Sequence, residues 1–170
     1  MSFDNITKID AIFIYSSDKS RILGQYYTNR IAEDQKEIFE GEIFDRAQQD
    51  PESVVFLHKD YLIAIYRDND FISFIIGDKK CNELIFDEIH RTFFTALEMI
   101  ISSKVETLTL TENMGSVYLT LDNLIDQGYP FIIEPDEIFA NVSMKDSDTN
   151  SRSSSATSKA ATLFGFLRRF

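Results

Sequence analysis

The sequence predicts an α+β fold in which helices pack against a five-stranded antiparallel sheet. Three observations lead to this class. Short runs of β-branched and aromatic residues alternate with tight polar turns, which is typical of antiparallel strands. Longer segments carry apolar residues at three- and four-residue spacing, which is typical of amphipathic helices. The expected order, β-β-α-β-β-β-α-α, leaves no room for a parallel doubly wound sheet.

The first three elements are two strands and a helix. Residues 8–16 (KIDAIFIYS) are rich in β-branched and aromatic residues and predict a buried strand. A polar turn separates them from residues 21–27 (RILGQYY), the expected hairpin partner. Residues 34–48 then form an amphipathic helix that ends before Asp50 and Pro51. Its expected apolar stripe is Ile38, Phe39, Glu42, Ile43, Phe44 and Ala47.

Three strands and a long helix are expected next. Residues 54–58, 61–67 and 71–76 are divided by short polar breaks, so they predict a meander of antiparallel hairpins. Asn82 is expected to cap a helix over residues 83–102. The buried stripe of that helix is expected to contain Ile85, Phe86, Ile89, Phe93, Phe94, Ala96, Leu97, Ile100 and Ile101.

The last elements are helical with one extended segment. Residues 112–126 predict a helix with Gly128 as its stop, followed by an extended stretch over 129–133 and a short helix over 135–141. The apolar face of the first of these helices is expected to hold Met114, Val117, Tyr118, Leu121, Leu124 and Ile125.

Composition divides the chain into a domain, residues 1–142, and a Ser-rich tail, residues 143–170. The 170 residues carry a formal net charge of −11, of which the domain contributes −14 and the tail +3. The polar tail is expected to be disordered because it cannot repay the entropy of ordering. The acidic domain argues against nucleic-acid binding, since phosphate recognition depends on Lys and Arg. The lone Cys81 excludes an internal disulfide framework and fits a reducing compartment, and no secretory signal or membrane span is recognisable.

No residue pattern predicts catalysis, a metal or a cofactor. The six glycines are scattered and form no nucleotide-binding loop, and Gly24 and Gly77 are expected in turn or close-packing roles. His90 with Cys81, Asp87 and Glu88 could be drawn as a metal cluster, but it lacks two ligands four residues apart on one helical face, so His90 is expected on a solvated helix edge. His58 is expected at a strand end, and Cys81 at a helix start without a positioned base. The carboxylates of Asp45, Asp87, Glu88, Asp122 and Asp126 are expected on solvated outer faces.

Surplus apolar residues favour an interaction module over an enzyme. A domain of this size can fill its core and leave apolar side chains for a partner, although the sequence does not show which residues bind it. The segment 163–170 (LFGFLRRF) is apolar and basic. It is either a contact for a partner groove or for anionic lipid, or a terminus without function.

Several local strings, in this order and spacing, resemble the zeta-subunit family of the COPI coatomer and, more distantly, the sigma small subunits of clathrin adaptor complexes. The resemblance covers residues 8–142. Its strings are KIDAI (8–12), RILGQYY (21–27), DQK (34–36), IF (43–44), IG (76–77), NEL (82–84), ENM (112–114), LD (121–122) and LIDQG (124–128). NEL and DQG favour zeta over sigma.

This resemblance implies a longin-like fold and a role without catalysis. It implies pairing with the trunk of the coatomer gamma subunit in an adaptor-like core, which an Arf-family GTPase recruits to Golgi membranes through other subunits. The implied setting is cytoplasmic and peripheral on Golgi membranes and COPI vesicles, in retrograde Golgi-to-ER and intra-Golgi transport. A sigma-type subunit, another longin-domain tether or SNARE-regulatory protein, and an enzyme on an α+β scaffold are the alternatives.

Sigma subunits carry an apolar pocket for dileucine signals near the start of the fifth strand and the end of the long helix. The resemblance places Asp70 and Lys104 in that region. A charged lining offers little to a leucine pair, so the chain is not expected to keep this pocket.

Overall fold

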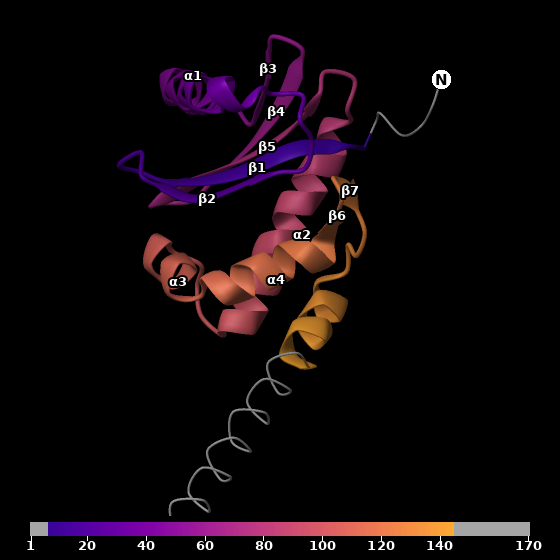
Figure 1. The fold of residues 1–170 in the computed structure, drawn as a ribbon. Coiled ribbons are helices and arrows are strands. Elements are labelled where there is room, and N and C mark those ends of the chain that lie inside the picture. The colour runs from indigo at the N-terminus through magenta and orange to yellow at the C-terminus, as the bar shows by residue number, and fades with distance from the viewer. Residues whose placement is uncertain (1–6, 145–170) are drawn as a thin grey trace, which may run out of the picture.

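The computed structural model describes residues 7–144 and contains a five-stranded antiparallel sheet (Figure 1). The sheet order is β2-β1-β5-β4-β3, so the first and fifth strands lie side by side at its centre. The strands are β1 (Ile9–Ser16), β2 (Arg21–Tyr26), β3 (Val55–His58), β4 (Tyr61–Arg67) and β5 (Phe71–Asp78). The predicted sheet is confirmed, with strand ends within two residues of those expected. The tail beyond residue 144 lies outside the described residues, so the division at residue 142 stays a prediction.

Helices cover both faces of the sheet (Figure 1). A 3-10 turn, η2 (Glu33–Gln35), leads into α1 (Lys36–Gln49), which lies alone on one face. The other face carries α2 (Glu83–Ile101), with α4 (Met114–Leu124) packed against it and α3 (Thr107–Glu112) to one side, in contact with β2. A two-stranded ribbon, β6 (Ile125–Asp126) and β7 (Tyr129–Pro130), follows α4, and residues 135–144 are helical. Within the described residues no helix is long and apolar enough to cross a membrane.

The core consists of two apolar clusters separated by the sheet. Successive side chains of a strand point to opposite faces, so β1 sends Phe13 and Tyr15 toward α1 and Ile12 and Ile14 toward α2. Gly77 of β5 lies where the α2 cluster is tightest. A Cβ added there would lie 2.5 Å from a ring carbon of Phe86, which explains the close-packing role expected for this glycine.

The cap predicted for α2 is confirmed, but some residues expected on the buried faces of the helices are exposed. Asn82 caps α2 as expected, since its side-chain oxygen accepts the backbone N–H of Leu84 at 3.0 Å. On α1, however, Ile38 is 64% exposed and Glu42 lies outside the buried stripe, whereas Glu40 is buried. Tyr118 is likewise exposed on α4.

The helix predicted over residues 112–126 is present as α4, which begins at Met114 and ends at Leu124, but the preceding helix α3 was not predicted. Asn113 leaves the helical region of backbone space, with φ −114° and ψ 30°, and its amide donates back to the Thr109 carbonyl at 2.8 Å. The Thr-rich start of α3 is held by the turn before β5, since the Thr107 backbone N–H donates to the Asp70 carboxylate at 2.8 Å. A tertiary contact therefore creates a helix that local periodicity does not indicate.

Gly128 forms a hairpin turn and does not stop α4, which ends at Leu124. Gln127 (φ 49°) and Gly128 (φ 90°) both have left-handed backbone and connect β6 to β7. The Ile9 backbone N–H donates to the Gly128 carbonyl at 2.7 Å, which fastens the ribbon to the start of β1. The segment that follows the ribbon therefore lies beside α2.

Candidate partner-binding surface

An open apolar groove lies between the N-terminal half of α2 and residues 129–133. Its volume is about 440 Å³, and Glu88 is its one charged lining residue. Leu84, Phe131 and Ile133 line it and are 72%, 69% and 49% exposed. Folding of the described residues leaves these large apolar side chains in water, which is the property expected of a surface for a protein partner.

One wall of the groove is α2, and the other is residues 129–133, which hydrogen bonds hold in place. On α2, Leu84 and Glu88 are four residues apart and therefore share a face, while Ile89 turns into the core. The opposite wall is fixed at two points: the Phe131 N–H donates to the Leu124 carbonyl at 2.8 Å, and the Thr92 hydroxyl donates to the Ile133 carbonyl at 3.1 Å. The groove is thus built before any partner arrives.

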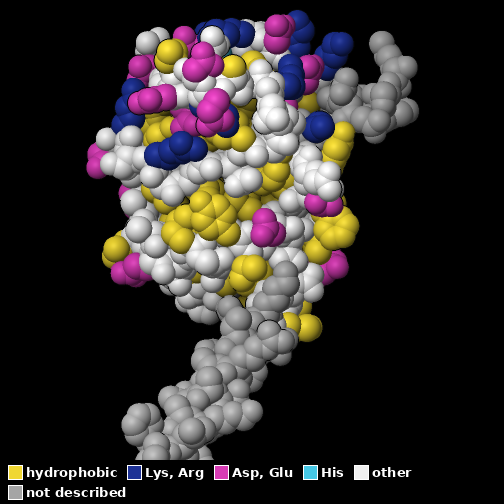
Figure 2. Space-filling model, viewed as in Figure 1, with side chains coloured by type: hydrophobic (Ala, Val, Ile, Leu, Met, Phe, Trp, Pro, Cys, Tyr) yellow, Lys and Arg dark blue, Asp and Glu magenta, His cyan; other side chains and the backbone are white. Residues whose placement is uncertain are grey.

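Exposed apolar side chains extend beyond the groove across the helical side of the molecule. Leu108, Tyr118, Phe139 and Met144 are 65%, 44%, 37% and 65% exposed. In Figure 2, dark blue and magenta side chains crowd the upper part, over α1 and the strands, whereas yellow patches lie over the lower part. The α2 side of the sheet is therefore the more apolar one in this view.

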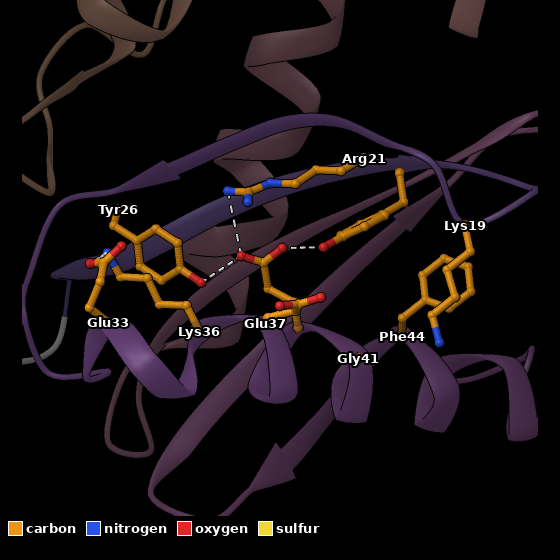
Figure 3. A pocket seen from close by; sticks show the side chains of 10 residues that line it. Lys19, Arg21, Tyr26, Glu33, Lys36, Glu37, Gly41 and Phe44 are labelled. Atoms are coloured by element: carbon orange, nitrogen blue, oxygen red, sulfur yellow. Dashed lines mark hydrogen bonds and ion pairs between the residues drawn. The ribbon is translucent and has the colours of Figure 1, made fainter.

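A second hollow, of about 550 Å³, lies between the β1–β2 edge and α1 (Figure 3). Glu40 is at its centre, 5% exposed, and its carboxylate accepts the hydroxyls of Tyr15 and Tyr26, the latter at 2.7 Å. Arg21 reaches the same carboxylate at 3.5 Å by lying across Gly24, where a Cβ would overlap the guanidinium. Burial, followed by the hydrogen bonds to Glu40, raises the pKa of both tyrosines, so both stay protonated donors.

This cluster ties the sheet edge to α1 and offers no reactive group. The Glu40 carboxylate has three donors, and Lys36 lies 4.2 Å from the centre of the Tyr26 ring. The buried Glu40 charge is thus paired with Arg21, and Lys36 is paired with Glu33. The burial of Glu40 was not predicted, although Glu40, Ile43 and Phe44 have the three- and four-residue spacing of one buried face.

His58 lies at the end of β3, as expected, and contacts Glu42 at 2.9 Å and the ring of Phe39, on the α1 side of the sheet. The residues that could be drawn as a metal cluster, His90, Cys81, Asp87 and Glu88, do not form one in the structure. Cys81 is buried, its thiol lies 3.5 Å from the Lys8 carbonyl, and burial raises its pKa to about 11. Across residues 7–144, no group of three His, Cys, Asp or Glu side chains gathers closely enough to hold a metal ion. Asp87 and Glu88 remain on the surface of α2.

His90 is buried against the sheet instead of lying on the solvated helix edge expected for it. It is 2% exposed, contacts the Ser73 hydroxyl at 3.1 Å, and packs on the rings of Tyr66 and Phe94. Burial lowers the pKa of His90 from 6.5 to about 3, so the imidazole is neutral at neutral pH.

His90 is expected to make the fold sensitive to acid. Below pH 6.5 the unfolded chain binds a proton at His90 that the folded chain rejects until about pH 3, so the free energy of unfolding decreases as pH falls through this window. The loss between about pH 7.5 and about pH 5 is about 2 kcal/mol. Urea unfolding of the wild type and His90→Gln at both pH values measures it. An equal pH dependence in both proteins would contradict this assignment.

Comparison with known proteins shows the family to which the chain belongs. The family model described as "Clathrin adaptor complex small chain" matches residues 8–149. The chain belongs to this family. Coatomer subunit zeta-2 of Mus musculus is 26% identical over 143 residues, which are 83% of this chain and 69% of the relative. Coatomer subunit zeta-2 of Arabidopsis thaliana is 26% identical over 161 residues, 92% and 90% of the two chains. Coatomer subunit zeta-1 of Homo sapiens is 27% identical over 143 residues, 82% and 79%.

A solved-structure comparison supports the fold of this small-chain family. One chain of the structure described as a homology model of the full-length AP-3 complex in a stretched open conformation matches with a TM-score of 0.62. The match covers 86% of this chain and 98% of that chain at 19% identity, so it shows the longin-like fold alone. Both the predicted fold and the predicted resemblance to coatomer zeta are confirmed.

The two residues assigned to the sigma-type pocket both make local polar contacts in this small chain. Lys104 forms an ion pair with Asp68 at 3.2 Å, and Asp70 holds the start of α3. The hollow that Asp70 lines, about 590 Å³, is bordered by Ile22 and Met114 together with hydroxyl and charged side chains, namely Ser16, Ser17, Asp18, Ser20, Arg21, Thr107 and Thr111. The expected loss of the sigma-type pocket therefore stays a prediction.

Proposed function

We propose that this chain is a non-enzymatic small subunit of a COPI-type vesicle coat and pairs with the trunk of the large gamma subunit. The observation that carries the proposal is the preformed apolar groove, in which Leu84 and Phe131 are exposed. Membership of the small-chain family and the similarity to subunits named coatomer zeta support the choice of coat.

The proposed mechanism is physical. A domain whose sheet is packed on both faces presents a fixed surface, and that surface shields apolar side chains of the trunk from water. Permanent subunit interfaces commonly bury about 2,000 Å² or more, with an apolar centre. In this role the small chain stabilises one conformation of its larger partner and catalyses no reaction.

Attachment to the membrane is proposed to be indirect. The described residues carry many more carboxylates than cations, and an acidic surface is repelled by anionic lipid headgroups. An Arf-family GTPase and other coat subunits would therefore bring the chain to the cytosolic face of Golgi membranes and COPI vesicles. The transport steps proposed are Golgi-to-ER and intra-Golgi.

Co-expression of the full chain with the gamma trunk tests the proposed function. The expected result is one stable heterodimer on size exclusion with light scattering, whereas the chain alone is poorly soluble because its groove is open. The matched control is co-expression with the trunk of a clathrin-adaptor large subunit, which would select a sigma-type role if it bound instead. A well-behaved monomer that ignores both trunks would contradict the proposal.

We also propose that residues 1–142 form the coat-binding domain and that the Ser-rich tail is dispensable for pairing. Residues 135–144 end the described part of the chain, and Val142 is fully buried. A chain that ends at Met144 keeps this anchor and serves as the comparison with the full chain in the same co-expression experiment.

A further inference from the structure

The outer layer on the α2 side of the sheet has an unusual charge distribution. We call residues 105–144 the carboxylate layer. It contains α3, α4, the β6–β7 ribbon and the final helical residues (Figure 1). All Lys and Arg of the described residues lie at or before Lys104. The layer holds seven carboxylates, all exposed: Glu106, Glu112, Asp122, Asp126, Glu134, Asp136 and Glu137.

None of these carboxylates forms an ion pair in the described part of the chain, although Glu106 contributes to the raised pKa of Lys104. Every ion pair there joins residues between Asp10 and Lys104. Lys104 forms an ion pair with Asp68, and Arg91 forms one with Glu88. Lys8 lies over the Tyr129 ring at 5.2 Å. The layer therefore presents uncompensated negative charge.

The fold explains only part of this charge. Glu134, Asp136 and Glu137 flank the start of the final helix, where the helix dipole favours anions. Glu112 is the last residue of α3, and Asp122 lies in the last turn of α4. At the end of α4 the dipole disfavours the Asp122 carboxylate, whereas Glu112 lies two residues before Met114 and is therefore near the start of α4 as well as the end of α3. The helix dipole thus does not account for the charge at Asp122.

Apolar side chains lie among these carboxylates. Leu108, Tyr118, Phe131 and Phe139 all belong to the layer and are exposed, and Phe131 also lines the apolar groove. The layer therefore shares Phe131 with the groove and carries exposed apolar side chains and carboxylates together. In the lower part of Figure 2, hydrophobic side chains (yellow) and carboxylates (magenta) occur together, and no Lys or Arg (dark blue) is visible there.

We propose that the carboxylate layer and the apolar groove form a single docking surface for a protein whose complementary face carries Lys and Arg around an apolar centre. The inference rests on the proposed function, because it takes the gamma trunk as that protein. Charge complementarity of this kind accelerates encounter and fixes orientation, and the apolar centre supplies most of the affinity.

Charge reversal with a matched control tests the proposal. One variant combines Glu112→Lys, Asp122→Lys and Asp126→Lys in the layer. The control combines Asp34→Lys, Asp50→Lys and Glu52→Lys, which reverse three exposed carboxylates at the two ends of α1 and change the net charge equally. Binding of each full chain to the gamma trunk is measured at about 0.05 M and about 0.3 M salt. The layer variant is expected to bind at least about tenfold more weakly at low salt and to lose most of the salt dependence, and the control stays within about threefold of wild type.

Thermal unfolding separates binding from folding, since all three layer positions are exposed and Asp122→Lys improves the helix dipole of α4, so the melting temperature should change little. Equal effects of the layer and control variants would overturn the proposal. So would binding that is lost in a chain ending at Met144 and unaffected by the layer variant, since the contact would then belong to the tail. A wild type that binds no trunk refutes the proposed function itself, a distinct result.

Discussion

Replacing Leu84 and Phe131 together by aspartate is expected to weaken binding to the gamma trunk by at least about 100-fold. Both side chains are largely exposed in the isolated chain, so the fold loses little when they change. In the complex they would be buried, and each substitution removes apolar contact area and places a carboxylate in an apolar centre. Together the two changes cost about 3 kcal/mol or more of binding free energy. Isothermal titration calorimetry at fixed salt measures the change.

The control for this prediction uses exposed apolar residues elsewhere. Val54 and Leu57 are 69% and 56% exposed at the β3 edge of the sheet, and the same double change to aspartate introduces the same charge. The control is expected to bind within about threefold of wild type. Equal losses in the two double variants would show that charge alone weakens binding, and a loss confined to Val54 and Leu57 would place the partner at the β3 edge.

Arg30→Ala is expected to lower the free energy of unfolding by about 3 kcal/mol. Asp10 of β1 is 2% exposed, and Arg30 donates to its carboxylate at 2.7 Å while also reaching Asp78 of β5 at 3.0 Å. The guanidinium lies 4.8 Å from the centre of the Tyr61 ring. Without Arg30, the buried carboxylate keeps only the Thr28 hydroxyl, at 2.6 Å, as a side-chain donor. Urea unfolding near neutral pH measures the loss.

Two further variants test the reason for this loss. Lys79→Ala removes an exposed ion pair with Asp60 and is expected to cost less than about 0.5 kcal/mol, because solvent screens that pair. Adding Asp10→Asn to Arg30→Ala removes the buried charge and should restore part of the stability. If Arg30→Ala costs no more than Lys79→Ala, the Asp10 carboxylate does not depend on Arg30.

This ion pair also bears on the proposed surface. Asp10 directly follows Ile9, whose backbone N–H holds the β6–β7 ribbon through Gly128. The register between β1 and β5 shifts between Ile9 and Ala11, so Asp10 sits at an irregular point of the sheet. Arg30 fixes that point and thereby supports the ribbon that leads into the groove wall.

Much of the fold could be predicted because its signals are local. The polar breaks after residues 58 and 67 divide strands that pair with their neighbours, and the side-chain period of two accounts for the two-faced core. Asn82 supplies a cap with a defined mechanism. The helix over 107–112 could not be predicted, because an alternating Thr-Leu pattern resembles a strand until Asp70 holds its first turn.

The sequence indicated the kind of candidate site, a partner-binding surface, but not where it lies in the fold. Apolar surplus indicated a partner surface, yet an exposed Phe131 and a buried Phe93 look alike in sequence. Periodicity shows which residues share a face and cannot show whether another element covers it. Buried polar residues were missed for the same reason: Glu40 and His90 gain their partners from strands far away in the chain.

The sequence by itself determined the α+β class, the five sheet strands, the helices α1, α2 and α4, the small-chain family and the acidity, since all of these depend on composition and local pattern. Only the tertiary structure decided that the 129–133 segment lies against α2, that Leu84 and Phe131 stay in water, and that the carboxylates of residues 105–144 form no ion pairs. Those properties depend on which distant segments meet, and contacts between distant segments leave no periodic trace in a single sequence.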